Sequence, residues 1–144
     1  MPHLVIYYTA NLETKVNMTA LCRNMADAML AVRDEDGKQV FPTGGTRVLA
    51  YPAPHFAVAD GGAVGRAAGG SGDYGFVYMN LRIGKGRSAV THQIAGQALS
   101  AAARAQFAAL LATEHMGLTV QIDEGHEVFD AKHSTLHPLF SKAV

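Results

Sequence analysis

The chain has 144 residues and a mass of 15.2 kDa, and its twelve basic and twelve acidic residues give a formal net charge of zero. This balance, with no basic run, argues against nucleic acid and anionic membranes as partners, and no apolar run reaches the roughly eighteen residues of a membrane span. The single cysteine, Cys22, excludes an intrachain disulfide and suits a reducing compartment. These features predict a soluble cytoplasmic protein.

The first half of the chain predicts a strand, a helix and a second strand. Residues 4–9 are rich in β-branched and aromatic residues, which is typical of a strand. Asn17 is a typical helix N-cap, and an acidic turn at residues 34–38 ends the expected helix. A second strand is expected over residues 46–51. Between Asn17 and the turn, one apolar stripe has helical spacing: Met18, Leu21, Cys22, Met25, Met29 and Val32.

The second half predicts the same order of elements after an irregular segment. Residues 52–73 lack periodicity and are rich in Pro, Gly and Ala, which favours a long mobile loop. Residues 74–83 alternate as a strand does. Ser88 is expected to cap a long helix whose apolar side extends to Leu111, with Gly117 just past its end. A fourth strand is expected over residues 118–123, and a helical turn over residues 135–142.

This order predicts an α+β fold built from two similar β-α-β units, residues 2–51 and 74–124, joined by the loop at residues 52–73. Each unit is expected to be a parallel strand pair with a crossover helix. The chain of 144 residues is predicted to be a single domain with both helices on one face of a four-stranded sheet. Partner subunits are the expected cover of the other face.

Pro2 is the first candidate for chemistry. Removal of the initiator methionine, which is usual before a small residue, would leave Pro2 with a free secondary amine. A free α-amine titrates near pH ~8, and burial or a neighbouring cation lowers its pKa, so that the amine could act as a general base. The alternative is a proline that merely fits the first position of a strand.

A glycine-rich turn at residues 84–88 is the second candidate. It lacks the spacing of a P-loop, and the G-x-G-x-x-G pattern at residues 70–75 precedes a strand, so neither is a nucleotide fingerprint. Glycine N–H groups, a helix N-terminus, Lys85 and Arg87 nevertheless favour a carboxylate or phosphate at this turn. An exposed basic turn is the alternative.

The seven histidines raise a metal hypothesis, since His133 and His137 are four residues apart and acidic residues lie nearby. However, no cysteine partner or known ligand spacing accompanies them, and Pro138 disturbs the helix that would align the pair. We therefore expect no metal site. Cys22 belongs to the apolar stripe and is not expected to be a nucleophile.

Short motifs occur in a fixed order along nearly the whole chain. They are Pro2-His3, Phe41-Pro42 followed by Gly45-Thr46-Arg47, Ala59-Asp60-Gly61, Asp-Tyr-Gly-Phe-Val at residues 73–77, and Ile-Gly-Lys-Gly-Arg-Ser at residues 83–88. In this order the motifs resemble the 5-carboxymethyl-2-hydroxymuconate delta-isomerases of the tautomerase superfamily. The Pro-His start and the Arg-Ser turn are the most specific part of the resemblance.

The resemblance implies a homotrimer of β-α-β-β-α-β subunits with a four-stranded mixed sheet. It also implies a cofactor-independent isomerase of aromatic catabolism that ketonises a dienol carrying three carboxylates. Pro2 would transfer the proton, and Arg47 and Arg87 would hold substrate carboxylates, with Lys85 as a further substrate-binding candidate. No metal, nucleic acid or membrane partner is implied.

Two alternatives remain open at this point. One is a non-catalytic, ferredoxin-like module in which the turn at residues 84–88 binds an anionic effector. The other is a tautomerase acting on a different keto-enol acid. Residues 62–72 are an insertion relative to the family pattern, and we expect them to act as a lid, to reshape the pocket or to alter which dienol fits.

Overall fold

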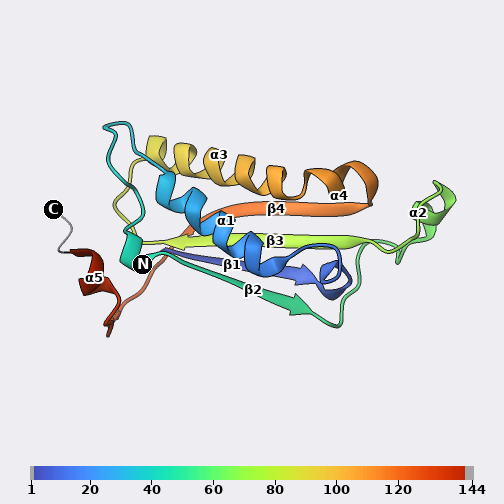
Figure 1. Cartoon of the computed structure of the whole chain (residues 1–144), viewed down its shortest axis with the longest axis horizontal. Helices are drawn as coiled ribbons and strands as arrows, with labels where there is room; N and C mark the ends of the chain where they lie inside the picture. Colours follow the sequence, from blue (N-terminus) through green and yellow to red (C-terminus); the bar gives the residue numbers. More distant parts are fainter. Residues whose placement is uncertain (1, 142–144) are drawn as a thin grey trace.

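The computed structural model describes residues 2–141, which form a four-stranded sheet with helices on one face (Figure 1). The strand order is β2-β1-β3-β4. The β1–β2 and β3–β4 pairs are parallel and the β1–β3 pair is antiparallel, so the predicted α+β class with a mixed β-α-β-β-α-β sheet is confirmed. The strands are β1 (His3–Thr9), β2 (Arg47–Ala53), β3 (Gly75–Ile83) and β4 (Met116–Glu124).

Two long helices make the crossovers, and both begin at the predicted caps. The side chain of Asn17 accepts a hydrogen bond from the Ala20 N–H at 3.0 Å, and that of Ser88 accepts one from the Thr91 N–H at 3.1 Å. These caps start α1 (Met18–Ala31) and α3 (Ala89–Gln106). The shorter helices are α2 (Ala63–Ala67), α4 (Ala108–Thr113) and α5 (His137–Ser141), with 3-10 turns η1 (Ala10–Leu12) and η2 (Thr43–Gly45).

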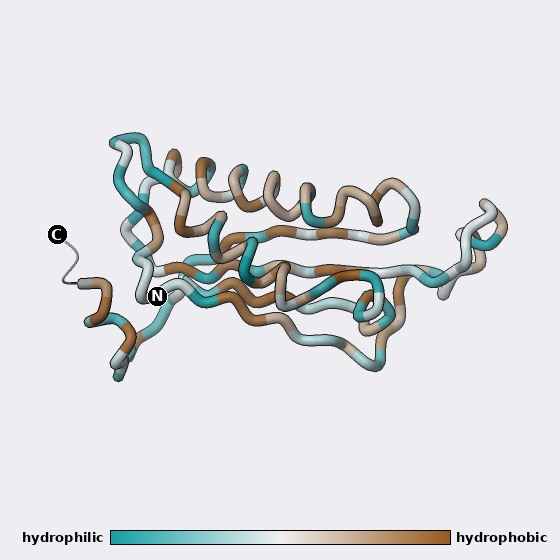
Figure 2. The backbone as a smooth tube through the Cα atoms, in the orientation of Figure 1, coloured by the Kyte–Doolittle hydropathy of each residue, from teal (hydrophilic) through white to brown (hydrophobic). Residues whose placement is uncertain are grey.

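The core lies between the sheet and the two long helices. Figure 2 shows apolar residues along the strands and long helices, and hydrophilic residues in the turn that links α1 to β2. Alternate residues of β1 and β3 are buried beneath the helices, as their alternation predicts. The buried strand residues are Leu4, Ile6, Tyr8, Val77, Met79, Leu81 and Ile83, and those of the helical stripe are Met18, Leu21, Met25, Met29 and Val32.

The opposite face of the sheet is uncovered in the single chain. Large apolar side chains lie there with much of their surface exposed: Tyr7, Leu49, Tyr51 and Phe76. The ring centroids of Tyr7 and Tyr51 are 5.9 Å apart, so the patch is continuous across the β1–β2 pair. Exposed apolar area of this kind marks a surface for association.

Two helix predictions need correction. The long second helix breaks at Phe107, whose side chain is fully buried and whose backbone leaves helical geometry, so the remaining turns form α4. Gly117 lies inside β4, opposite Phe76, and is not the residue that follows the helix. The absence of a Cβ at Gly117 leaves room for the Phe76 ring, since a Cβ there would be 3.2 Å from Phe76 Cδ1.

The segment predicted as a loop over residues 52–73 is partly ordered secondary structure. Strand β2 extends to Ala53, and α2 forms within the insertion. The Asp60 carboxylate accepts hydrogen bonds from the N–H groups of Gly62 and Val64, which fixes the start of α2. Figure 1 shows α2 at the end of the sheet opposite to the N-terminus, so within one subunit the insertion does not cover Pro2.

Among the described residues, none of the helices combines the length and hydrophobicity that crossing a bilayer requires.

Candidate active site

The candidate site lies at the end of the sheet where β1 and β2 begin and where β3 and β4 finish. The register places His3 beside Arg47 on one side and beside Arg82 on the other. Ile83 pairs with Glu124 at the same end. Pro2, Arg47 and the turn at residues 84–88 are therefore brought to one edge of the molecule, although they are far apart in sequence.

Pro2 is buried and immediately precedes β1. Its carbonyl oxygen accepts a hydrogen bond from the Arg47 N–H at 3.2 Å, which continues the parallel ladder by one residue. The ring nitrogen of an internal proline carries no N–H, and a proline inside a strand therefore removes a hydrogen-bond donor from the sheet. Pro2 precedes the first residue of the strand, so no donor is lost. The backbone of Pro2 is thus fixed directly against β2.

The Arg47 side chain is held at the start of β2 by main-chain oxygens. Its Nη1 donates to the carbonyl oxygens of Gly44 at 2.8 Å and Thr46 at 3.0 Å. Arg47 lines a pocket of about 400 Å³ that is bordered by α1, η2 and Phe140 of α5. A guanidinium has five N–H donors, and Arg47 uses one nitrogen for these two carbonyls.

Arg87 bridges the turn after β3 and the segment that follows α1. Its Nη2 donates to the Val40 carbonyl at 3.2 Å and its Nη1 to the Gly84 carbonyl at 3.3 Å. The guanidinium carbon lies 5.6 Å from the centroid of the buried Phe41 ring, a cation–π distance. Lys85, two residues earlier, is exposed.

The chain's own Glu35 occupies the start of α3, where the sequence favours an external anion. Its carboxylate accepts hydrogen bonds from the hydroxyls of Ser88 at 3.0 Å and Thr91 at 2.7 Å. The pKa of Glu35 lies below its usual value, because its own backbone N–H and then these two hydroxyls donate to the carboxylate. An external anion at this position would have to displace Glu35, which weighs against the effector-binding alternative.

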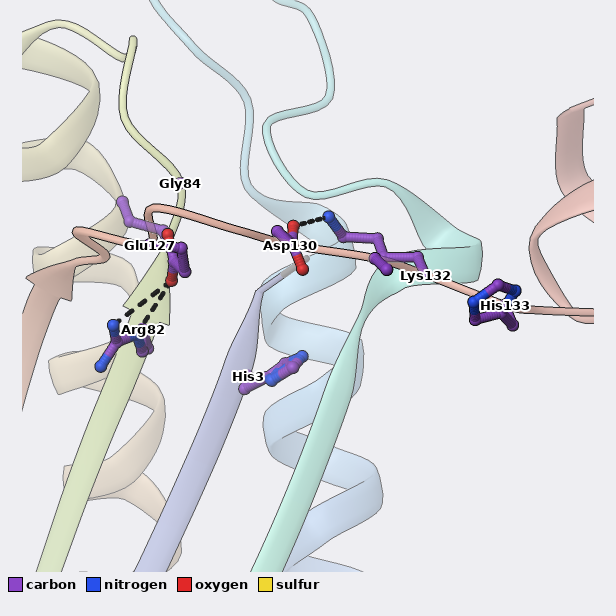
Figure 3. Close-up of a pocket in the computed structure, with 9 residues that line it drawn as sticks. His3, Arg82, Gly84, Glu127, Asp130, Lys132 and His133 are labelled. Carbon is purple, nitrogen blue, oxygen red and sulfur yellow. Dashed lines mark hydrogen bonds and ion pairs between the residues drawn. The ribbon is translucent and has the colours of Figure 1, made fainter.

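A pocket of about 480 Å³ lies beside His3, and none of its charged side chains was a predicted site residue (Figure 3). Arg82 and Gly84 border it from the sheet. The C-terminal tail, which we define as residues 125–136, crosses over it and contributes Glu127, Asp130, Lys132 and His133. The tail then enters α5, which packs against η2: a Cβ on Gly44 would lie 2.9 Å from His137 Cα.

The pKa of His3 is affected by burial and by the charged groups at this end of the sheet. Its pKa lies below the usual histidine value, first because the imidazole is partly desolvated and then because positive charges, among them Arg47 and Arg82, surround it. The Arg47 and Arg82 guanidinium groups that lower this pKa are groups that bind anions. Across residues 2–141, no group of three His, Cys, Asp or Glu side chains is placed to hold a metal ion.

Sequence reasoning missed Arg82 and the tail for different reasons. Arg82 lies in the strand predicted over residues 74–83, and only the pairing with His3 and the path of the tail make it part of a pocket. The tail has no periodic pattern from which its path could be predicted. The one available signal was a concentration of charged and histidine residues at positions 124–133.

The comparison with protein families is decisive for identity. The model of the family described as 5-carboxymethyl-2-hydroxymuconate isomerase matches residues 2–140. The chain belongs to this family. The match begins at Pro2 and includes the tail, so it covers every element that forms the candidate site.

Known proteins agree with this assignment. A crystal structure of a 5-carboxymethyl-2-hydroxymuconate delta-isomerase is 61% identical with a TM-score of 0.95, over 100% of this chain and 95% of that chain. The isomerase from Deinococcus radiodurans R1 is 31% identical with a TM-score of 0.78, over 96% and 93% of the two chains. The delta-isomerase of Escherichia coli is 28% identical over 140 residues, 97% of this chain and 99% of its own.

A more distant structure shows the fold alone. It is a fused 4-OT, described as a symmetric trimer, at 17% identity and a TM-score of 0.55 over 97% of this chain and 98% of its own. The tautomerase fold inferred from the motifs is thus confirmed.

Proposed function

We propose that this chain is a cofactor-independent isomerase that ketonises a carboxylated 2-hydroxymuconate dienol, of the 5-carboxymethyl-2-hydroxymuconate type, in aromatic catabolism. The observation that carries the proposal is the family match, which begins at Pro2 and extends over residues 2–140. The positive surroundings of His3, next to Pro2, suit a substrate with several carboxylates. The proposed location is the cytoplasm.

In the proposed mechanism, the secondary amine of Pro2 removes the proton from the enol oxygen. The electron pair moves through the conjugated system, the carbonyl forms, and the same proton is delivered from the ammonium to the far carbon. The product is the oxo-alkene, and protons and electrons balance without a cofactor. General acid–base catalysis of this kind contributes about 10²- to 10⁴-fold to the rate.

Arg47, Arg87 and Lys85 are the proposed carboxylate-binding residues of this reaction. Arg47 is adjacent to Pro2 through the backbone hydrogen bond, and Arg87 lies at the same end of the sheet. Positive charge near a developing dienolate stabilises the transition state, and a guanidinium can bind a carboxylate with two parallel hydrogen bonds. The same charge would lower the pKa of a neighbouring amine.

We further propose that the chain is a single domain and that three copies of it form a homotrimer. The exposed patch of Tyr7, Leu49, Tyr51 and Phe76 supports association through the open face of the sheet. The fused 4-OT, which shares the fold, is described as a trimer. In a trimer, three such faces would enclose a common interior, which also suits the polar residues of β3.

An ultraviolet assay of dienol ketonisation tests the function. Wild-type protein, shown by mass spectrometry to begin at Pro2, should convert the carboxymethyl-hydroxymuconate dienol, and Pro2→Ala should reduce kcat by about 10²-fold or more. A Leu4→Val variant, which changes a buried core side chain at the start of β1, is the matched control for disturbance of the strand. Equal turnover by wild type and Pro2→Ala would contradict the proposal, as would turnover of none of a panel of muconate dienols by the wild type.

A further inference from the structure

The pocket beside His3 contains two cationic side chains from distant parts of the chain. Arg82 projects from β3, and Lys132 comes from the tail that crosses above the strand ends (Figure 3). Each cation already holds a carboxylate of the tail. Arg82 donates through Nε and Nη2 to Glu127 Oε1, both at 3.3 Å, and Lys132 forms an ion pair with Asp130.

Both ion pairs are exposed to solvent, and the Arg82–Glu127 pair is also weak by its geometry. The Arg82 and Glu127 side chains are 57% and 45% exposed. Ion pairs that are this exposed contribute little to stability, because water and salt screen them. A distance of 3.3 Å is also longer than the roughly 2.7–2.9 Å of a strong charge-assisted hydrogen bond. Both Arg82 nitrogens donate to the same oxygen of Glu127. The guanidinium therefore does not form the two parallel hydrogen bonds, one to each oxygen, that a carboxylate allows.

The charges of the pocket balance only while the tail acids are in place. With Glu127 and Asp130 paired, these four side chains sum to zero. If the acids turn outward to solvent, the pocket presents two positive charges next to His3. Two positive charges match a ligand with two carboxylates, and little free energy opposes the exchange because both acids would gain full hydration.

We propose that Arg82 and Lys132 bind two carboxylates of the substrate, and that Glu127 and Asp130 occupy these cations when the pocket is empty. The inference rests on the proposed function for the ligand being a polycarboxylate. The tail acids are then intramolecular competitors of the substrate. The tail also explains how a pocket with no net charge can take a multiply anionic molecule.

The competition predicts that removal of the Glu127 charge and removal of the Arg82 charge change the affinity for a polycarboxylate in opposite directions. The affinity is measured by calorimetric titration with tricarballylate, an unreactive tricarboxylate. Glu127→Gln should tighten binding by about 3- to 10-fold, because the competitor is removed. Arg82→Gln should weaken it by about 10-fold or more, and the Arg82→Gln, Glu127→Gln double variant should bind as weakly as Arg82→Gln alone. Asp27→Asn is the matched control, since Asp27 pairs with Arg23 on α1 at similar exposure.

Weaker binding by Glu127→Gln would overturn the inference, because it would make Glu127 a structural support of the tail. Unchanged binding by Arg82→Gln would overturn it as well. Because the titration needs no turnover, its result tests the inference independently of the proposed isomerase activity. An inactive protein with the predicted order of affinities keeps the inference and rejects the function, whereas an active enzyme whose variants bind like wild type does the reverse.

Discussion

Arg87 combines a structural and a proposed binding role in one side chain. It joins the turn after β3 to the Val40 carbonyl and lies over the Phe41 ring. A planar guanidinium with several N–H donors makes these contacts, and lysine cannot reproduce them because it carries a single ammonium group on a flexible chain. The residue is therefore sensitive to a change that keeps its charge.

We predict that Arg87→Ala raises KM by about 10-fold or more and lowers the free energy of unfolding by roughly 1–2 kcal/mol, since hydrogen bonds from a charged donor are lost. Arg87→Lys should recover only part of either loss. Arg23→Ala, which removes an exposed ion pair on α1, is the control in the kinetic and urea-unfolding measurements. Unchanged KM in Arg87→Ala would remove Arg87 from the proposed substrate contacts.

Ionisation of Tyr8 makes the free energy of unfolding depend on pH. Burial first, and then its hydrogen bond to the Glu13 carboxylate, raise the pKa of Tyr8 to about 12. An unfolded tyrosine titrates near pH ~10. Between these values the unfolded chain has lost a proton that the folded chain keeps, so the free energy of unfolding falls as the pH rises.

We predict that wild-type protein loses about 1 kcal/mol more stability than Tyr8→Phe between pH 9 and pH 11. Urea unfolding at the two pH values measures the difference. Phenylalanine keeps the ring in the core and removes only the ionisable group, so the comparison isolates the proton. Equal losses in both proteins would show that Tyr8 does not carry this pH dependence.

At the scale of elements, η2 and α5 form the contact that anchors the tail. Gly44 is buried, and a Cβ there would lie 2.9 Å from His137 Cα and 3.1 Å from Phe140 Cδ2. Because one of these atoms is backbone, the contact cannot be relieved by a side-chain rotation alone. The anchoring of α5 in turn holds the tail that carries Lys132 across the pocket.

Gly44→Ala should therefore separate α5 from η2, expose the tail to limited proteolysis and raise KM, with little effect on the sheet. Gly96→Ala on α3 is the matched control, because its Cβ would meet only Ile122 Cδ1 at an ordinary 3.6 Å. Hydrogen exchange across residues 125–141 provides the second measurement. Unaltered protection of the tail in Gly44→Ala would contradict this account of the anchor.

At the scale of the whole molecule, the open sheet face is the surface with the strongest reason to associate. We predict that Leu49→Glu, which places a charge in the patch, converts the proposed trimer to monomers in light-scattering measurements. Val90→Glu is the control, since Val90 is as exposed as Leu49 but lies on α3. A monomeric wild type, or a trimer that survives Leu49→Glu, would contradict the proposed assembly.

The fold was predictable because its signals are local. The alternation in β3 and the caps at Asn17 and Ser88 each depend on a few neighbouring residues. Long-range contacts carried no such signal: Glu35 reaches Ser88 across 53 residues, and Glu127 reaches Arg82 across 45. The break at Phe107 was also missed, because core packing overrides a continuous helical pattern.

The roles of Pro2, Arg47, Arg87 and Lys85 remain predictions at the residue scale. The role of Pro2 depends on a free amine at the start of β1, and that amine can be blocked without altering any side chain. Insertion of one alanine between Met1 and Pro2 converts the Pro2 nitrogen into an amide while the strand that follows is unchanged.

The ketonisation rate of this insertion variant, compared with protein that begins at Pro2, is the most direct measurement. The account predicts a fall in kcat of about 10²-fold or more, with unchanged unfolding and unchanged tricarballylate affinity. A variant that ketonises the dienol at the wild-type rate, with its blocked terminus verified by mass spectrometry, would contradict it.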